Sequence, residues 1–169
     1  ALAKNPKPTY LRLAREKTPI ITTLETPYEL GKAQVYWMPN EGIAEVGIIT
    51  TGGLTHRTIL AAKELETEGI KTKVLNLAGI KPIDVNAILI LAKETGAIVT
   101  VEEHQVAGGM GSAVLEVLGE NYPVPIEFVG VRNLFGQSGK PEELIEYYGM
   151  GKESIKKAVR KVLSRKSKS

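Results

Sequence analysis

The chain has 169 residues, 43% of them hydrophobic, which is enough for one well-buried core and too little for two full domains. It contains no cysteine, which excludes disulfides, thiolate metal sites and cysteine nucleophiles, and its two histidines argue against a histidine-rich metal site. No apolar run approaches the roughly 20 residues of a membrane span. Lys4, Pro6, Lys7 and Pro8 interrupt the N-terminal stretch in a way that argues against a signal peptide. We therefore expect a cytoplasmic protein and, since the chain opens without methionine and almost directly on a strand, a fragment.

The formal net charge of +3 is unevenly distributed along the chain. Residues 152–169 contain eight Lys and Arg residues against Glu153 alone, so the rest of the chain is slightly acidic. Such a basic tail is compatible with nucleic-acid binding, but a solvated helix face with a frayed end is the favoured interpretation. We expect neither a nucleic acid nor a membrane as a partner.

The N-terminal third predicts little regular structure. Residues 10–14 alternate and predict a short strand, and residues 15–27, with prolines and threonines, predict an extended linker. Residues 33–37 alternate again and predict a second strand, followed by a turn over residues 39–42.

From residue 46 onwards, strands and helices alternate. Strands are predicted over residues 46–50, 72–77, 98–102 and 126–131. Helices are predicted over residues 54–68, 84–95 and 112–119, with two closing helices over residues 142–148 and 152–163. Asp84 is placed to cap its helix, Gly69 and Gly96 are placed to end theirs, and Ile155 and Val159 lie on the apolar stripe of the last one. This alternation predicts parallel pairing with right-handed crossovers, hence an α/β fold of three layers, an αβα sandwich.

In an open parallel sheet, ligands gather at the carboxyl ends of the strands. The polar residues expected there include Thr51, Gly52 and Gly53, a turn that either cradles an anion against helix N–H groups or simply needs glycine. We favour the tight turn.

The acidic pair Glu102 and Glu103, followed by His104, could form an acid/base cluster. The alternative is that one glutamate caps a helix while His104 orders the glycine-rich turn, and no second catalytic partner is visible in the sequence. The glycines of residues 108–111 lack the spacing of a dinucleotide fingerprint, and residues 136–140 lack that of a phosphate loop. We assign no catalytic, cofactor-binding or metal-binding residue.

Arg15 leaves the first predicted strand toward the linker. A guanidinium there could grip a phosphate or carboxylate in a bidentate contact, and an ordinary surface arginine is equally compatible with the pattern.

Several motifs in order resemble one family. They lie at residues 10–15 with 17–19, 47–53, 77–84, 101–104 with 108–113, and 135–139. Together they resemble the C-terminal part of transketolase, in particular the short subunit of the split form, over nearly the whole chain. The same domain occurs in 1-deoxyxylulose-5-phosphate synthase and in the beta subunits of 2-oxoacid dehydrogenases, and the motif of residues 13–19 favours transketolase.

The resemblance implies a transferase that moves a two-carbon ketol unit between sugar phosphates, using thiamine diphosphate and Mg²⁺, as in the pentose phosphate reactions. It implies that residues 1–26 are the end of a pyrimidine-binding domain and a linker, and that residues 27–169 are the C-terminal domain. That domain would hold a mixed, mainly parallel five-stranded sheet with residues 33–37 antiparallel. It would be mainly structural, acting in a homodimer with an N-terminal transketolase subunit or domain, and this part alone would be inactive and bind no cofactor.

Two residues receive specific expectations from the resemblance. Arg15 matches the arginine that grips the sugar phosphate, whereas Asn133 stands where relatives usually carry Asp before the Phe-Gly turn. The candidate residues for a site rim or an anion-binding turn are Thr51, Gly52, Gly53, Glu103, His104 and Gly109. Two other functions stay open: a regulatory module that binds a small anion at these turns, and a purely architectural dimerisation domain.

Overall fold

The computed structural model describes residues 7–14 and 17–166. It contains one five-stranded sheet with the strand order β1-β3-β2-β4-β5. The strands are β1 (Gln34–Trp37), β2 (Val46–Thr50), β3 (Thr72–Asn76), β4 (Ile98–Gln105) and β5 (Ile126–Val131). β1 pairs antiparallel with β3, and the other three pairings are parallel. The mixed sheet with one antiparallel strand is therefore confirmed.

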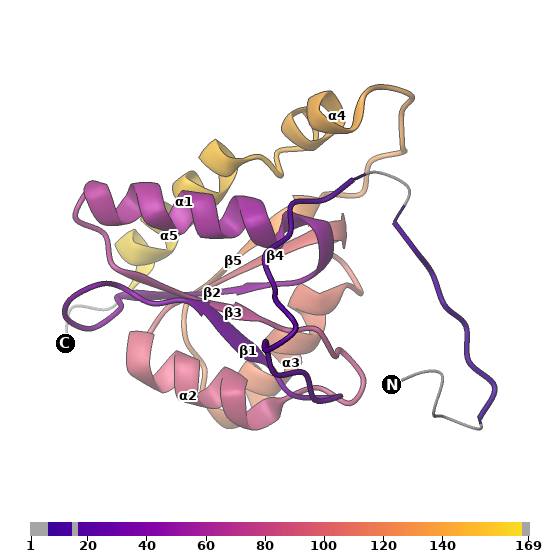
Figure 1. Ribbon diagram of the computed structural model, residues 1–169. Coiled ribbons are helices and arrows are strands. Elements are labelled where there is room, and N and C mark those ends of the chain that lie inside the picture. The colour runs from indigo at the N-terminus through magenta and orange to yellow at the C-terminus, as the bar shows by residue number, and fades with distance from the viewer. Residues whose placement is uncertain (1–6, 15–16, 167–169) are drawn as a thin grey trace.

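Helices cover both faces of the sheet (Figure 1). α1 (Thr55–Thr67) and α5 (Lys152–Arg165) lie on one face, and α2 (Val85–Thr95) and α3 (Met110–Asn121) lie on the other. The short α4 (Pro141–Tyr147) precedes α5. No helix in the described part of the chain is long and apolar enough to cross a membrane.

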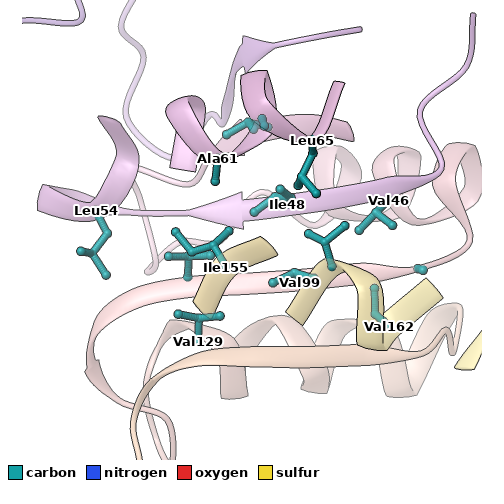
Figure 2. Close-up of a cluster of buried hydrophobic side chains, with 14 of the residues drawn as sticks. Val46, Ile48, Leu54, Ala61, Leu65, Val99, Val129, Ile155 and Val162 are labelled. Atoms are coloured by element: carbon teal, nitrogen blue, oxygen red, sulfur yellow. The ribbon is translucent and has the colours of Figure 1, made fainter. Parts of the chain in front are cut away.

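The alternation of side chains along each strand divides the core in two. Ile48 and Val99 point into a cluster with Ala61 and Leu65 of α1 and Ile155 of α5, which Figure 2 shows. On the opposite face, a second cluster joins the strands to α2 and α3; it includes Ile49, Leu75, Ile98, Leu91 and Val114. Two buried layers of apolar side chains, one on each side of the sheet, are what a three-layer sandwich requires.

The helix boundaries follow local chemistry. The side chain of Asp84 accepts a hydrogen bond from the backbone of Ala87 and caps α2, which ends at Gly96 in the left-handed conformation with φ +65°. Gly69, with φ +83°, follows the end of α1. These three roles confirm the sequence prediction. Three elements are longer than expected: β4 continues to Gln105, α3 spans Met110–Asn121 rather than residues 112–119, and α5 continues to Arg165.

The strand predicted over residues 10–14 does not form. These residues are extended but belong to no sheet, and Tyr10, Leu11 and Leu13 are exposed. A strand needs a neighbour to pair with, and the alternating pattern of residues 10–14 cannot supply one by itself. Within the predicted linker, residues 17–27 contain no helix or strand, whereas residues 15 and 16 lie outside the described part.

The basic C-terminal helix is not simply a solvated face. Lys156 is buried and its ammonium group contacts Glu64, Glu68 and Glu153. Glu127 of β5, also buried, binds both Lys161 and Arg165. Part of the positive charge of α5 therefore meets acidic side chains of the domain. The remaining basic face is solvated as expected, since Lys157, Arg160, Lys161 and Arg165 are exposed.

Candidate functional site

The polar residues singled out in the sequence gather at one edge of the sheet. β2, β3, β4 and β5 run parallel, so their carboxyl ends lie at the same edge. The turn after β2, the acidic end of β4 and the loop after β5 all lie there, as the sequence predicts.

Glu102 is a helix cap. Its side chain is buried, and its carboxylate accepts hydrogen bonds from the backbone amides of Met110 at 2.7 Å and Gly111 at 2.8 Å. These amides belong to the first turn of α3 and have no partner within the helix. A carboxylate also interacts favourably with the positive end of the helix dipole. This is why α3 begins two residues earlier than predicted.

The structure does not bring the acidic pair and the histidine together as an acid/base cluster. Successive residues of a strand point to opposite faces of the sheet. Glu102 faces α3, whereas the carboxylate of Glu103 lies on the other side, next to Gly53. His104 is exposed, and its Nδ1 lies 2.9 Å from the carbonyl oxygen of Gln105. The geometry therefore supports the capping interpretation of Glu102.

The turn at Thr51, Gly52 and Gly53 is a tight connection into α1. Gly52 has φ +66°, a conformation that favours glycine, and Gly52 to Leu54 form a short 3-10 helix. The backbone amide of Thr51 donates to Val101, and the neighbouring carboxylate of Glu103 places negative charge beside the turn. Both features weigh against an anion here and support the tight-turn interpretation.

A shallow hollow of about 330 Å³ lies beside this turn. Linker residues 18–22 form one wall, and Gly52, Gly53 and His56 form the other. The linker therefore crosses the carboxyl edge of the sheet before it reaches β1.

The glycine-rich turn of residues 108–111 has no free backbone amide for an anion. The amide of Gly108 donates to Ser112 Oγ, that of Gly109 to Val106, and the next two donate to Glu102. A Cβ on Gly109 would collide with the Glu102 carboxylate, so the cap itself requires glycine at this position. The turn is built for close packing.

Gln105 fixes the loop that follows β5. Its side-chain oxygen accepts from the amide of Asn133 at 2.8 Å, and its side-chain nitrogen donates to the carbonyl of Leu134 at 3.1 Å. Tyr148 donates from its hydroxyl to the carbonyl of Phe135 at 2.7 Å. Asn133 has φ +52°, which asparagine tolerates better than most residues. The turn thus forms with Asn133. The roles of Gln105 and Tyr148 were not predicted from the sequence because no local pattern marks them.

The described residues offer no group of three or more His, Asp or Glu side chains that could hold a metal ion. A Mg²⁺ ion that binds a diphosphate takes one or two protein carboxylates and fills its other positions with phosphate oxygens and water. We assign none of the described residues to such an ion and derive no chemical step through that cofactor. Arg15, the candidate phosphate-binding residue, lies outside the described residues.

Comparison with known proteins decides the family. The family described as "Transketolase, C-terminal domain" matches residues 37–155, which spans most of the chain. The chain belongs to the transketolase C-terminal domain family.

The relatives of this transketolase C-terminal domain include subunits of larger enzymes. The 6-deoxy-6-sulfo-D-fructose transketolase subunit SqwH of Clostridium sp. (strain MSTE9) is 42% identical over 95% of this chain and 48% of its own length. A subunit of the apulose-4-phosphate transketolase of Phocaeicola vulgatus is 37% identical over 91% of this chain and 48% of its own length. The chain therefore spans about half the length of these relatives.

A solved structure supports the fold of this transketolase domain. It is described as "Split gene transketolase, inactive beta4 tetramer" and is 40% identical, with a TM-score of 0.84, over 90% of this chain and 49% of its own. Its similarity confirms the α/β architecture derived above.

Proposed function

We propose that this chain acts in a complete transketolase that transfers a two-carbon ketol unit between sugar phosphates. The observation that carries the proposal is the family match over residues 37–155, together with relatives that are transketolase subunits. Those names favour a transketolase over the two other enzyme classes that share this domain. Thiamine diphosphate and Mg²⁺ supply the ketol-transfer chemistry in such an enzyme, and we assign no residue of this chain to them.

The proposed domain boundary lies in the linker. Residues 1–26 would end a pyrimidine-binding domain and lead out of it, and residues 27–169 would form the C-terminal domain. The exposed apolar side chains of Tyr10, Leu11 and Leu13 support this division, because an alternating segment of this kind suits a strand in another sheet.

The residues at the carboxyl edge would form the rim of the complete site. Thr51, Gly52, Gly53, Glu103, His104 and Gly109 belong to this proposed rim. The linker that crosses the same edge supports the proposal, since it brings the preceding part of the protein close to these residues. Arg15 would bind the substrate phosphate from the end of that preceding part.

The proposed partners are an N-terminal transketolase subunit or domain and further copies of this chain. The subunit names of the relatives and the tetramer of the solved neighbour support both partners. Within this assembly, the chain would mainly provide structure and contacts between subunits.

The test is a turnover assay with thiamine diphosphate, Mg²⁺ and a ketose phosphate donor. This chain should show no ketol transfer when assayed alone. An enzyme assembled with the pyrimidine-binding and diphosphate-binding domains should show it. Robust turnover by the chain alone, or none by the assembled enzyme, would contradict the proposal.

A further inference from the structure

Residues 27–33, called the anchor segment, connect the linker to β1 and are held by two side chains of the domain. The backbone amide of Ala33 donates to Asp84 Oδ2 at 3.0 Å, and the other oxygen of this carboxylate accepts from Ala87 and caps α2. At the other end of the segment, the carbonyl oxygen of Pro27 accepts from the side-chain amide of Gln34, the first residue of β1. A helix cap uses only one side-chain oxygen, so the second oxygen of Asp84 is committed to the anchor segment.

A close backbone contact adds to these hydrogen bonds. Gly31 has φ +79° and lies against the loop between β3 and α2, where a Cβ on Gly79 would come within 3.1 Å of its backbone nitrogen and Cα. A Cβ on Gly31 would in turn lie 3.1 Å from Pro82. Two backbones approach this closely where glycine leaves out the side chains between them. The anchor segment is therefore packed against the domain as well as hydrogen-bonded to it.

The anchor segment lies at the carboxyl edge of the sheet, where the proposed rim also lies. β1 runs antiparallel to β3, so Gln34 pairs with Asn76, the last residue of β3. Before the anchor segment, residues 17–25 of the linker are exposed, and a hollow of about 430 Å³ lies between Ile21 of the linker and Ile59 of α1. The anchor segment is thus the first part of the chain after the linker that the domain holds firmly.

We propose that Asp84 and Gln34 are positioning residues of the complete enzyme. By holding the anchor segment, they fix the path of the linker over the carboxyl edge and thereby the place of Arg15. This inference rests on the proposed function, in which Arg15 binds the substrate phosphate. Neither positioning residue touches the substrate. They restrict the directions from which the guanidinium meets the phosphate, and a misplacement of about 1 Å is enough to impair such a contact.

The first test measures tryptic cleavage of the folded chain at two bonds. Cleavage between Lys32 and Ala33 requires the anchor segment to detach, whereas cleavage after Lys17, in the exposed linker, does not. Asp84→Asn keeps one oxygen for the cap of α2, since asparagine caps helices well, but loses the second acceptor. The variant should speed cleavage at Lys32 about tenfold relative to cleavage at Lys17, because cleavage follows the population of the open form and a hydrogen bond to a charged group is lost.

Gln34→Glu is a second variant that leaves the cap of α2 intact. A carboxylate cannot donate to the carbonyl of Pro27, but it can still accept from the hydroxyl of Tyr36, which lies 2.9 Å from Gln34 Oε1. This variant should raise the same cleavage ratio. Glu29→Gln is the matched control, because it also exchanges a carboxylate and an amide, at an exposed position of the anchor segment. Circular dichroism melting establishes that all forms are folded. An unchanged cleavage ratio in both Asp84→Asn and Gln34→Glu would overturn the inference.

The second test uses the assembled enzyme of the proposed function. Asp84→Asn should raise the KM for a phosphorylated ketose donor about fivefold and leave the KM for an unphosphorylated donor nearly unchanged, because only the phosphate contact is misplaced. A loss of folded protein would instead lower the rate with both donors and change neither KM. Glu29→Gln should match the wild type. An equal change of KM for both donors would overturn this inference alone. An assembled wild type without turnover would contradict the proposed function, and this inference with it.

Discussion

Glu102 holds the first turn of α3 through Gly111, whose backbone amide lies 2.8 Å from the glutamate carboxylate. The same carboxylate accepts from Met110, so one buried side chain satisfies two amides that the helix leaves unpaired. The residue that the sequence places in a possible acid/base cluster is thereby committed to a structural role.

Glu102→Ala should therefore destabilise the domain by about 3 kcal/mol, because two buried donors lose their acceptor. Urea unfolding followed by circular dichroism measures this free energy. The matched control is Glu103→Ala, at the neighbouring exposed position, which should change stability by no more than about 0.5 kcal/mol. Equal effects of the two substitutions would show that Glu102 is not the cap.

Glu127 should make the free energy of unfolding decrease as the pH falls into the acid range. Burial raises the pKa of its carboxyl group. Hydrogen bonds and charge from Lys161 and Arg165 lower this pKa by more than burial raises it, so the net pKa lies below the ordinary value of 4.5. A depressed folded-state pKa stabilises the protein above the unfolded pKa, and this contribution is lost as the pH falls through the folded-state pKa.

Glu127→Gln should cost about 1 kcal/mol at pH 7, a figure that allows for solvent around the exposed basic partners. Unfolding measured from pH 7 to pH 3 should show the difference between wild type and variant shrinking below pH 4.5. Glu120→Gln, at an exposed position of α3, is the control. If the wild type is more stable than Glu127→Gln by the same free energy of unfolding at pH 3 as at pH 7, the lowered pKa of Glu127 is contradicted.

Among the lysines of α5, Lys156 should be the one whose substitution lowers the stability of the domain most. Its ammonium group lies 2.7 Å from Glu153 and 2.9 Å from Glu64, and these hydrogen bonds raise its pKa well above the ordinary value. Because the pKa of Lys156 is raised in the folded state, its contribution to the free energy of unfolding is fully present below the unfolded-state pKa. That contribution is lost only as the pH rises through the folded-state pKa.

Lys156→Met should lower the midpoint of thermal unfolding clearly more than Lys157→Met, its exposed neighbour on the same helix. The reason is that the substitution leaves acidic groups of α1 without their buried partner. Differential scanning calorimetry at pH 7 makes the comparison. If both variants melt together, the contact between α1 and α5 does not depend on this lysine.

Arg15→Ala tests the proposed phosphate contact in the assembled enzyme. The loss of a charged hydrogen bond of about 1.5–3 kcal/mol corresponds to a rise of roughly ten- to a hundredfold in the KM for phosphorylated substrates. Unphosphorylated substrates should be affected much less. An equal loss for both kinds of substrate would remove Arg15 from the phosphate site.

The strands show how much of the fold was predictable. β2 and β5 have the predicted bounds, because their apolar runs end at residues that clearly interrupt them. Asp84 and Gly96 were predictable as caps because capping depends on residues adjacent in sequence. Local chemistry of this kind is visible in the chain itself.

Contacts between distant residues were not predictable in the same way. Glu102 was one of two adjacent glutamates, and only the pleat of β4 decides which of them turns toward α3. The ion pairs of α5 were not visible in the sequence because the acidic partners, such as Glu64 and Glu127, lie 92 and 34 residues away from the lysines that they bind. The alternation of residues 10–14 predicted a strand but could not predict whether a neighbouring strand exists.

We propose that the reaction centre of the complete enzyme lies outside the residues of this chain. Isothermal titration calorimetry of the purified chain with thiamine diphosphate and Mg²⁺ is the decisive measurement. The chain alone should show no binding, and binding should appear once the pyrimidine-binding and diphosphate-binding domains are added. Tight binding of thiamine diphosphate to this chain by itself would contradict it.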